Sequence, residues 1–542
     1  MVARIWRLVP VLLLCGLVSC RHSPPTDAVS GATPKPKVLR YGNGTEPEEL
    51  DPQVATGIPE RTIMTALFEG LVDEDPKDLH PVPALARSWE LSADQMTYTF
   101  HLREGLRWSN GRALTANDFI LTFKRLLNPK FAATNAYLVF NVVAGAKAYY
   151  DGKTTDFATV GFKAPDPLTV VVTLSQPSPY FLRLMAGHYI WYPLPIPEIE
   201  ALGGLERRGS PWTRPEHIVT SGAFLLRTWD SEKKIVVVRN PAYWDAGNVK
   251  LDEIDFLATE DGATEERMFR TGQLDRTEGL PLGKIDVYKK EHPEVLTIAP
   301  YLGLYFYRCN VAKPPLNDKR VRKALALAID RESLIRDVLR GGQMPAYSVS
   351  RPGVAAYDPQ VRLEGSLDEA RRLLAEAGYP EGKGMPPVQI LYNTSEGHKQ
   401  IAEVIQQMWK TRLGVHAELT NEEWKVYLQT ARSGNYQIAR AGWIASYNDP
   451  LPFLDIWETG NGENETGWSN PEYDRLLHAS FSAKSEAERY ACYRKMDAIL
   501  VDECPILPIY FYTRVYLLSR RVSGYWPNFL DHHPFKAIDL IR

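Results

Sequence analysis

The sequence predicts an α/β fold divided into two or three lobes. Helical and extended patterns alternate along the chain, which is typical of α/β proteins and argues against an all-β sandwich. The 542 residues are too many for one hydrophobic core, because single cores stop growing at about 250–300 residues. Hydrophobic residues make up 44% and charged residues 24% of the chain, as in ordinary globular proteins.

Capping patterns predict three helices. Thr115 with Asp118, and Ser366 with Glu369, have the spacing of capping boxes, and Asn317-Asp318 precedes a third apolar stretch. The apolar residues that follow recur at helical spacing and are expected to face a core: Phe119, Phe123, Leu127, Val321, Ala324, Leu325, Ala328, Ile329, Leu367, Ala370, Leu373, Leu374 and Ala377. Alternating or β-branched runs predict strands at 97–102, 168–174 and 235–238.

The N-terminus predicts export. A basic start is followed by an apolar stretch at residues 8–18, which is too short to span a bilayer. Leu17-Val18-Ser19-Cys20 then resembles a bacterial lipoprotein processing site, so residues 1–20 are predicted to be a signal peptide with Cys20 lipidated. An ordinary cleavable signal that contains a cysteine is the alternative. Residues 21–37 are rich in Pro, Ser, Thr and Gly and are expected to be a flexible tether.

Enzymatic and metal-binding motifs are not evident in the sequence. It contains no Gly-x-Ser-x-Gly elbow, phosphate-binding loop, His-Glu-x-x-His or Cys-x-x-Cys. We therefore expect no catalytic residue, metal or cofactor, and we expect Asp531-His532-His533 to form a solvated turn before the last strand. No segment after the leader is apolar enough to cross a membrane. The net charge of -3 gives no reason to expect nucleic acid as a partner.

Three cysteines belong to the exported body. Cys492 falls on a predicted helix, residues 486–501, and Cys504 follows it. Since exported proteins can form disulfides, a Cys492–Cys504 bridge is a possible staple between that helix and the next strand. Cys309 is then left over and is expected to be buried.

Residues 439–450 carry the most specific signal. They read Ala-Arg-Ala-Gly-Trp-Ile-Ala-Ser-Tyr-Asn-Asp-Pro and resemble the strand and turn that hold a peptide in extracytoplasmic solute-binding proteins of family 5, which serve peptide ABC transporters. Further motifs occur in the order of that family, among them Leu67-Phe68-Glu69-Gly70-Leu71, Trp108-Ser109-Asn110-Gly111, Gly222-Ala223-Phe224, Tyr243-Trp244-Asp245, Pro315-Leu316-Asn317-Asp318 and Ala375-Glu376-Ala377-Gly378-Tyr379. The resemblance extends from about Leu39 to the C-terminus.

The resemblance implies a two-lobed periplasmic-binding-protein fold of the Venus-flytrap type (class II, cluster C), with an additional α/β domain. The first lobe would combine residues 38–69, 205–302 and 512–542. Residues 70–204 would form the extra domain and residues 303–511 the second lobe, with two strands crossing between the lobes.

The same resemblance implies a function in peptide import. A monomer at the periplasm or cell surface would capture a peptide or peptide-like ligand by hinge closure and deliver it to a membrane permease, whose ATPase belongs to other chains. An exported enzyme such as a peptidase, a different solute within the family, and a chaperone-like or signalling role are the alternatives.

The implied ligand site uses two backbone segments and several side chains. Thr56-Gly57-Ile58 and Gly442-Trp443-Ile444 would flank an extended ligand, because backbone hydrogen bonds are independent of ligand sequence. Trp424 and Trp443 would line side-chain pockets, and Arg440 and His398 would contact ligand carboxylates. Without the family, the glycines would be ordinary turn or bulge positions, His398 a helix-start residue and Arg440 an internal ion-pair partner.

Two departures from the family reduce negative charge at the amino-terminal end of that site. Ser446 stands where family members have an aspartate that pairs with the ligand's α-amino group, and Thr56 where a relative has a glutamate. Asp449 or Asp51 could compensate. Otherwise the ligand would be a peptide in a shifted register, a peptide with a modified amino end such as a cell-wall peptide, or a non-peptide solute.

One disulfide of a family relative is absent. Gly303 and Ile444 stand at the two positions that it would link.

Overall fold

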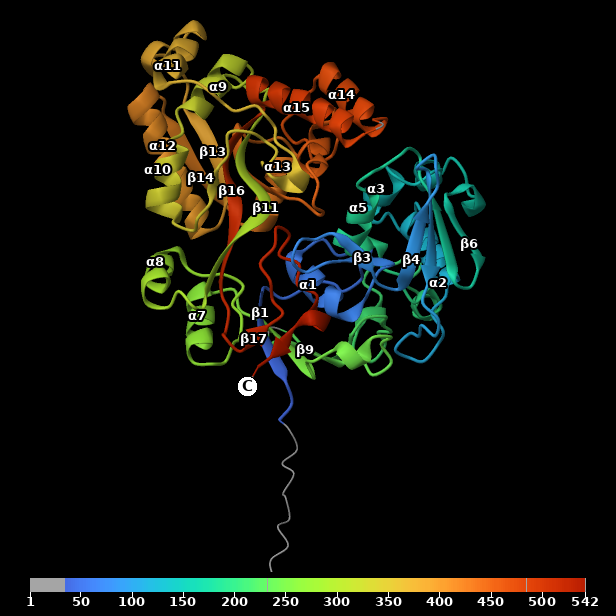
Figure 1. The fold of residues 1–542 in the computed structure, drawn as a ribbon. Coiled ribbons are helices and arrows are strands. Elements are labelled where there is room, and N and C mark those ends of the chain that lie inside the picture. The colour runs from blue at the N-terminus through green and yellow to red at the C-terminus, as the bar shows by residue number, and fades with distance from the viewer. Residues whose placement is uncertain (1–34, 232, 484, 542) are drawn as a thin grey trace, which may run out of the picture. The chain divides into compact units, whose positions relative to one another are not determined.

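Three sheets of four or more strands form the framework of the described residues (Figure 1). The computed structural model describes residues 35–541 except 232 and 484, and leaves out the side chains of residues 424 and 425. The predicted signal peptide with Cys20, and nearly all of the predicted tether, lie outside the described residues. The first sheet has the strand order β1-β10-β9-β8, namely β1 (Val38–Gly44), β10 (Glu253–Ala258), β9 (Lys234–Arg239) and β8 (Phe224–Asp230).

The second sheet is antiparallel throughout and has the order β4-β5-β7-β6. Its strands are β4 (Ala86–Leu91), β5 (Thr97–Leu102), β7 (Thr169–Thr173) and β6 (Phe162–Asp166). Alternate residues of β5 are buried, as the alternation of its sequence predicts. Helix α2 (Ala116–Leu126) packs on β6 and β7.

The third sheet carries four of the expected ligand-site residues, namely Arg440, Gly442, Trp443 and Ile444. It has six strands in the order β12-β16-β11-β15-β13-β14. These are β12 (Met344–Pro345), β16 (Ile506–Leu517), β11 (Leu296–Cys309), β15 (Ile438–Ile444), β13 (Val388–Asn393) and β14 (Ala417–Glu422). Helix α12 (Glu396–Leu413) packs on β13 and β14.

Strands β11 and β16 are long and change register halfway. They pair antiparallel from Leu296↔Leu517 to Pro300↔Thr513, and again from Leu304↔Phe511 onward. The register shifts between these two stretches and once more between Tyr305 and Phe306. Strand β15 pairs with β11 only from Gly303 onward. The two halves of each long strand therefore have different neighbours.

The predicted helices form as their caps suggest. The reciprocal bonds of the Thr115–Asp118 capping box are both present at α2. The Asp318 carboxylate accepts from the Arg320 amide (2.8 Å) at the start of α9 (Lys319–Leu327), and the Ser366 hydroxyl accepts from the Glu369 amide (3.1 Å) at the start of α11 (Leu367–Glu376). The other α-helices and strands of the described residues are α1 (Ile58–Leu67), α3 (Tyr137–Phe140), α4 (Ala146–Tyr150), α5 (Phe181–Gly187), α6 (Ile196–Ala201), α7 (Gly262–Arg270), α8 (Leu282–Glu291), α10 (Arg331–Ser333), α13 (Trp424–Arg432), α14 (Pro471–Phe481), α15 (Glu486–Glu503), β2 (Val72–Glu74), β3 (Pro81–Pro83), β17 (Val522–Ser523) and β18 (Asp539–Leu540).

The suggested Cys492–Cys504 disulfide is wrong, since both thiols are free. The two residues are twelve positions apart, with Cys492 inside α15 and Cys504 at its C-cap. A helix rises 1.5 Å per residue, so about 18 Å separates them, and a disulfide needs Cα atoms within about 7 Å. Cys309 is buried, as expected.

The largest apolar core crosses the expected domain boundaries. It joins residues between 71 and 219 with residues between 302 and 530. Tyr180 stacks on Tyr447 at this junction, with ring centroids 5.8 Å apart. Arg183 lies 3.8 Å from the Asp449 carboxylate. Among the described residues, no helix is long and apolar enough to span a bilayer.

Candidate functional site

Strand β15 presents a partly free backbone edge. Its neighbour β13 pairs with it only at Ile438 and Ala439. On the other side, Ala445 donates its amide to the Leu302 carbonyl (2.9 Å), and the Gln437 carbonyl accepts from Asn310 (2.8 Å). Because neighbouring residues of a strand point their backbone groups in opposite directions, Gly442 directs its N–H and C=O away from β11. No other described residue bonds to them.

Arg440 lies on this strand without an anionic partner among the described residues. Its guanidinium donates to the Tyr512 hydroxyl (3.0 Å) and the Asn393 side-chain oxygen (3.3 Å). It sits over the Tyr305 ring, 4.9 Å from the centroid, and its Nε is buried with no acceptor. An arginine remains charged at any physiological pH, so a positive charge is held here with only neutral contacts.

His398 is close to Arg440, near the start of α12. Its Nδ1 lies 3.4 Å from the Tyr305 hydroxyl, on the same tyrosine whose ring faces Arg440. Burial, helped by the charge of Arg440, lowers the pKa of His398 to about 3. The imidazole is therefore neutral at pH 7 and can donate or accept one hydrogen bond at each nitrogen according to its tautomer.

Two glycines on neighbouring strands allow close packing at this place. A Cβ on Gly442 would lie 2.7 Å from the Tyr512 hydroxyl. Gly303 is the cross-strand partner of Ile444, and a Cβ there would lie 2.3 Å from the Ile444 Cδ1. The positions at which a family relative has its disulfide are thus adjacent in this chain, and the isoleucine side chain fills the space.

The two tryptophans of the expected site differ in what is described. Trp443 is half-buried, and its indole N–H is buried without an acceptor among the described residues. Trp424 begins α13, but its side chain lies outside the described part of the chain.

Neither aspartate suggested as a substitute at Ser446 is available. Asp449 is fully buried and pairs with Arg489 at 2.8 Å. Asp51 pairs with Arg125 at 2.7 Å and also accepts from the Trp212 indole. Each carboxylate already has a buried arginine as its counter-ion, so neither is free to receive a ligand ammonium.

Thr56-Gly57-Ile58 lies at the N-terminus of α1. Thr56 is exposed, and Gly57 is the N-cap with extended backbone angles (φ −93°, ψ 160°). A Cβ on Gly57 would lie 1.9 Å from a Glu60 carboxylate oxygen. No hydrogen bond or ion pair between described residues joins this segment directly to β15.

A cavity that the sequence did not indicate lies beside the C-terminal segment. It has a volume of about 50 Å³ and is lined by α1, β2, the end of α5 and residues 532–536. The expected solvated turn at Asp531-His532-His533 is wrong, because these side chains are only 9%, 11% and 3% exposed. Nδ1 of His532 lies 2.5 Å from the carboxylate of the buried Glu74. The two residues are 458 positions apart, so no local pattern could have linked them.

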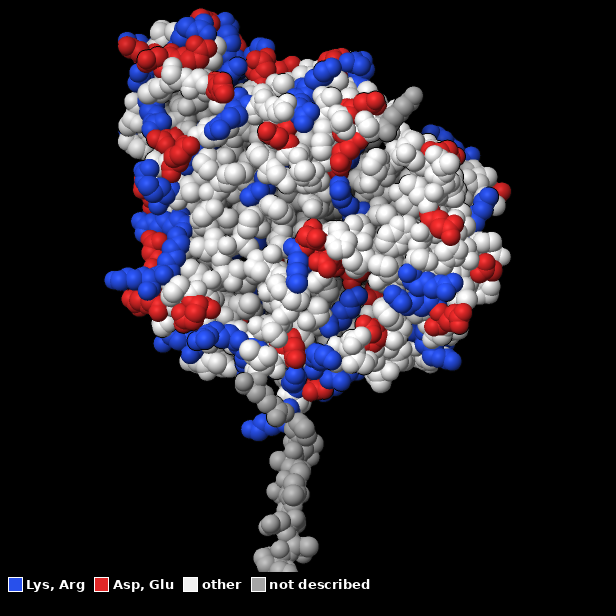
Figure 2. All heavy atoms as spheres, viewed as in Figure 1, with Lys and Arg blue, Asp and Glu red and all other residues white. Residues whose placement is uncertain are grey.

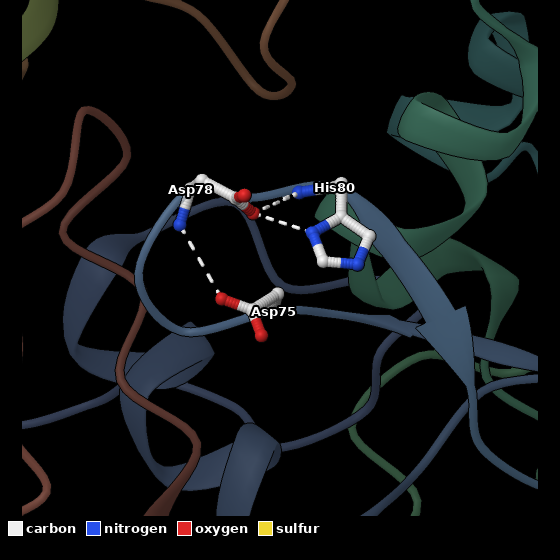
Figure 3. A group of neighbouring side chains, drawn as sticks. All are labelled: Asp75, Asp78 and His80. Atoms are coloured by element: carbon white, nitrogen blue, oxygen red, sulfur yellow. Dashed lines mark hydrogen bonds and ion pairs between the residues drawn. The ribbon is translucent and has the colours of Figure 1, made fainter.

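A second group of acidic residues and histidine is explained by a turn. Asp75, Asp78 and His80 lie together between β2 and β3 (Figure 3). Asp75 accepts from the Asp78 amide (3.4 Å), while Asp78 accepts from the His80 amide (3.1 Å) and contacts its ring. Asp78 and His80 are exposed, and these bonds are those of turn-forming aspartates.

On the face drawn in Figure 2, positive and negative side chains are interspersed.

Comparisons with known proteins place this geometry in a family. Residues 80–465 match the model of bacterial extracellular solute-binding proteins, family 5. The chain is 36% identical over 527 residues to the periplasmic oligopeptide-binding protein OppA of Escherichia coli (strain K12), covering 96% of this chain and 95% of that protein. It superimposes on Haemophilus influenzae OppA in complex with RPPGFSPFR with a TM-score of 0.81 and 34% identity, covering 94% and 99% of the two chains.

The Escherichia coli murein tripeptide binding protein MppA gives a TM-score of 0.83 with 32% identity, covering 94% of this chain and 99% of that one. These relatives match over 94–96% of this chain. The matches agree with the expectation of a cluster C periplasmic-binding-protein fold and a non-enzymatic role. The chain therefore belongs to the bacterial extracellular solute-binding proteins of family 5.

Proposed function

We propose that this chain is the substrate-binding component of a peptide ABC importer, and that it holds an extended peptide along the free edge of β15. The observation that carries the proposal is the combination of that edge with Arg440. Gly442 directs unsatisfied backbone groups outward, which suits the addition of a ligand strand. The relatives named above include proteins described as binding oligopeptides and a murein tripeptide.

Arg440 provides the carboxylate contact in this proposal. A guanidinium surrounded by tyrosines and lacking an anion among the described residues is matched by a ligand carboxylate, which accepts two parallel hydrogen bonds from it. His398, on the neighbouring α12, extends the site for longer ligands. Trp443 and Trp424 line side-chain pockets, and Thr56-Gly57-Ile58 lies on the opposite side of the ligand.

The lobes and their movement belong to the same proposal. Residues 38–69, 205–302 and 512–542 form one lobe, residues 303–511 the other, and residues 70–204 the extra domain. Strands β11 and β16 cross between the lobes and act as the hinge. Ligand contacts made in the closed state shift the equilibrium toward closure, and the closed monomer docks on the permease, which works with separate ATPase subunits.

Anchoring is the remaining part of the proposal. Lipidated Cys20 holds the protein at a membrane in the periplasm or at the cell surface, and residues 21–37 act as a tether. Globomycin treatment of the expressing cells would test this, since blocking lipoprotein processing should leave the full leader on the protein. A mature N-terminus other than Cys20 would contradict lipid anchoring.

Release of a co-purified ligand tests the function. The body from residue 21 onward, purified without a tag and without a refolding step, should carry a mixture of short peptides that denaturation releases for mass spectrometry. Arg440→Met serves as the matched variant and should carry at least about tenfold less peptide. A single non-peptide species in the unmodified protein would contradict peptide import and support a different solute within the family.

Ser446 supports a second candidate ligand, a peptide whose amino end is modified, as in cell-wall peptides. Asp449 and Asp51 are both neutralised by arginines, so a free α-amino group would need another anion. The released peptides identify the ligand, because a modified amino end is visible in their masses.

A further inference from the structure

The cavity beside the C-terminal segment contains a buried carboxylate with one free oxygen. Glu74 is 4% exposed, and its two oxygens differ in their surroundings. Oε2 contacts His532, while Oε1 is buried with no hydrogen-bond partner among the described residues. Leaving such an oxygen unsatisfied is unfavourable, so the site is suited to a hydrogen-bond donor that enters from outside the chain.

This oxygen lies near the end of the strand that carries the free edge. An ideal Cβ on Gly187 would be 3.1 Å from the Glu74 Oε1 and 2.8 Å from the Ser446 carbonyl oxygen. Since these distances share one end point, the two oxygens lie within about 6 Å of each other. Gly187 has no side chain to separate them. The backbone at Ser446, two residues beyond the end of β15, therefore lies beside Glu74.

The charges around the cavity favour a cation when Glu74 is ionised. Glu69, Asp73 and Glu74 line it together with Arg61 and Lys536. Lys536 pairs with Glu69 (2.6 Å) and Asp73 (2.7 Å). Burial lowers the pKa values of His532 and His533, so both are neutral at pH 7. Three carboxylates then oppose two cations, which leaves one net negative charge when Glu74 is ionised.

The protonation of Glu74 is the point on which the site depends. Burial raises its pKa well above the usual value, Asp73 adds to this, and the charge of Arg61 opposes it. A neutral His532 with its proton on Nδ1 donates to Oε2 and stabilises the carboxylate. A cation that enters the cavity favours the ionised form further.

We propose that Glu74, oriented by His532, is the anionic partner of a ligand ammonium group. It would replace the aspartate that family members have at the position of Ser446. The inference rests on the proposed function, since it assigns the amino end of a ligand held on β15. A cavity of about 50 Å³ accommodates a group the size of an ammonium, because one water needs about 10–15 Å³ on the same scale. Oε1 accepts one ammonium hydrogen, and the Ser446 carbonyl and the free Nε2 of His532 are within the same region.

The geometry also limits ligand length. Four strand steps separate Arg440 from Ile444, or about 13 Å at 3.3 Å per residue. A ligand with its carboxylate at Arg440 and its ammonium beside Glu74 must exceed this span. It therefore needs at least about four residues.

The test compares tetra- and pentapeptide pools with free or N-acetylated amino ends. Bound peptides are quantified by native mass spectrometry for the unmodified protein and for Glu74→Gln. We expect the unmodified protein to prefer free amino ends by about tenfold or more, and Glu74→Gln to reduce that ratio to near one. Adding Ser446→Asp to Glu74→Gln should restore the preference, because a carboxylate then returns to the same region.

Three outcomes would overturn the inference. The unmodified protein could bind both pools equally, Glu74→Gln could keep the preference, or Glu74→Gln could weaken both pools by the same factor, as a purely structural residue would. The comparison of the two pools on the unmodified protein needs no folded variant. Binding of neither pool would contradict the proposed function itself, which separates its failure from that of the ammonium site.

Discussion

Substitution of Arg440 and, as a control, of Arg308 tests which of these two buried charges binds a ligand. The two arginines lie on paired strands, where Arg440 faces Tyr307 and Arg308 faces Ala439 across the sheet. Arg308 forms an ion pair with Glu465, and both side chains are 10% exposed. Arg440 contacts only neutral groups among the described residues. Methionine replaces either arginine with an apolar chain of similar length.

The expected effects on stability differ because only one substitution creates an orphan charge. Arg308→Met leaves Glu465 buried without its counter-ion, which costs about 3–5 kcal/mol. Arg440→Met loses two hydrogen bonds to a charged donor, at about 1.5–3 kcal/mol each, and a cation–π contact of about 0.5–2 kcal/mol. It also removes a guanidinium buried without an anion, whose desolvation costs several kcal/mol. These terms offset one another, so we expect a net change below about 2 kcal/mol.

For peptide binding the order is reversed, and Arg440→Met should have the larger effect. Arg440→Met removes the partner of the ligand carboxylate and should weaken peptide binding by about 2–5 kcal/mol, or roughly 30-fold to several-thousand-fold. Urea unfolding of the ligand-free proteins gives the stability difference, and titration calorimetry with a peptide that co-purifies gives the affinity. If Arg440→Met unfolds as readily as Arg308→Met, or binds peptide normally, Arg440 is a structural residue and the reasoning is refuted.

Three further predictions concern packing, pH and thiols. Gly303→Ala should destabilise the protein by about 1–3 kcal/mol, since its Cβ would lie 2.3 Å from the Ile444 Cδ1. Urea unfolding measures this loss, and adding Ile444→Ala to the same chain should recover part of it. Equal losses with and without Ile444→Ala would contradict the clash. His398 has a folded pKa of about 3 and an unfolded pKa of about 6.5, so the unfolded chain binds the extra proton and stability should fall as the pH drops below about 6.5. His398→Gln should flatten that dependence between pH 7 and 4, and an unchanged slope would show that other groups cause it. The body from residue 21 onward, which does not contain Cys20, should show three reactive thiols on denaturation without reductant, and a count of one would support the disulfide.

The helices were predictable because their signals are local. A capping box such as Thr115 with Asp118 lies within one turn, and the bonds that it predicts do not depend on the rest of the chain. The strands at 97–102 and 234–239 follow for the same reason, from alternation or β-branching over a few residues. The disulfide was mispredicted because proximity in sequence was taken as proximity in space, while α15 continues to Glu503 and keeps Cys492 and Cys504 apart.

The candidate site was predictable only in part. The motif at 439–450 indicated Arg440 and Gly442 through the family resemblance, yet the sequence read alone favoured an internal ion pair for Arg440. Which charges are neutralised depends on residues distant in the chain. Asp449 forms an ion pair with Arg489, whereas Arg440 donates hydrogen bonds to Tyr512 and Asn393.

The family, the α/β class and the positions of the capped helices could be predicted from the amino-acid sequence, because these depend on short patterns and on motif order. Which charged groups have partners depends on the folded chain. It buried His532 against Glu74, where the sequence predicted a solvated turn, and it left Arg440 without an anion among the described residues. The physical reason is that desolvation and pairing of a charge depend on every element packed around it, and those elements come from opposite ends of the chain.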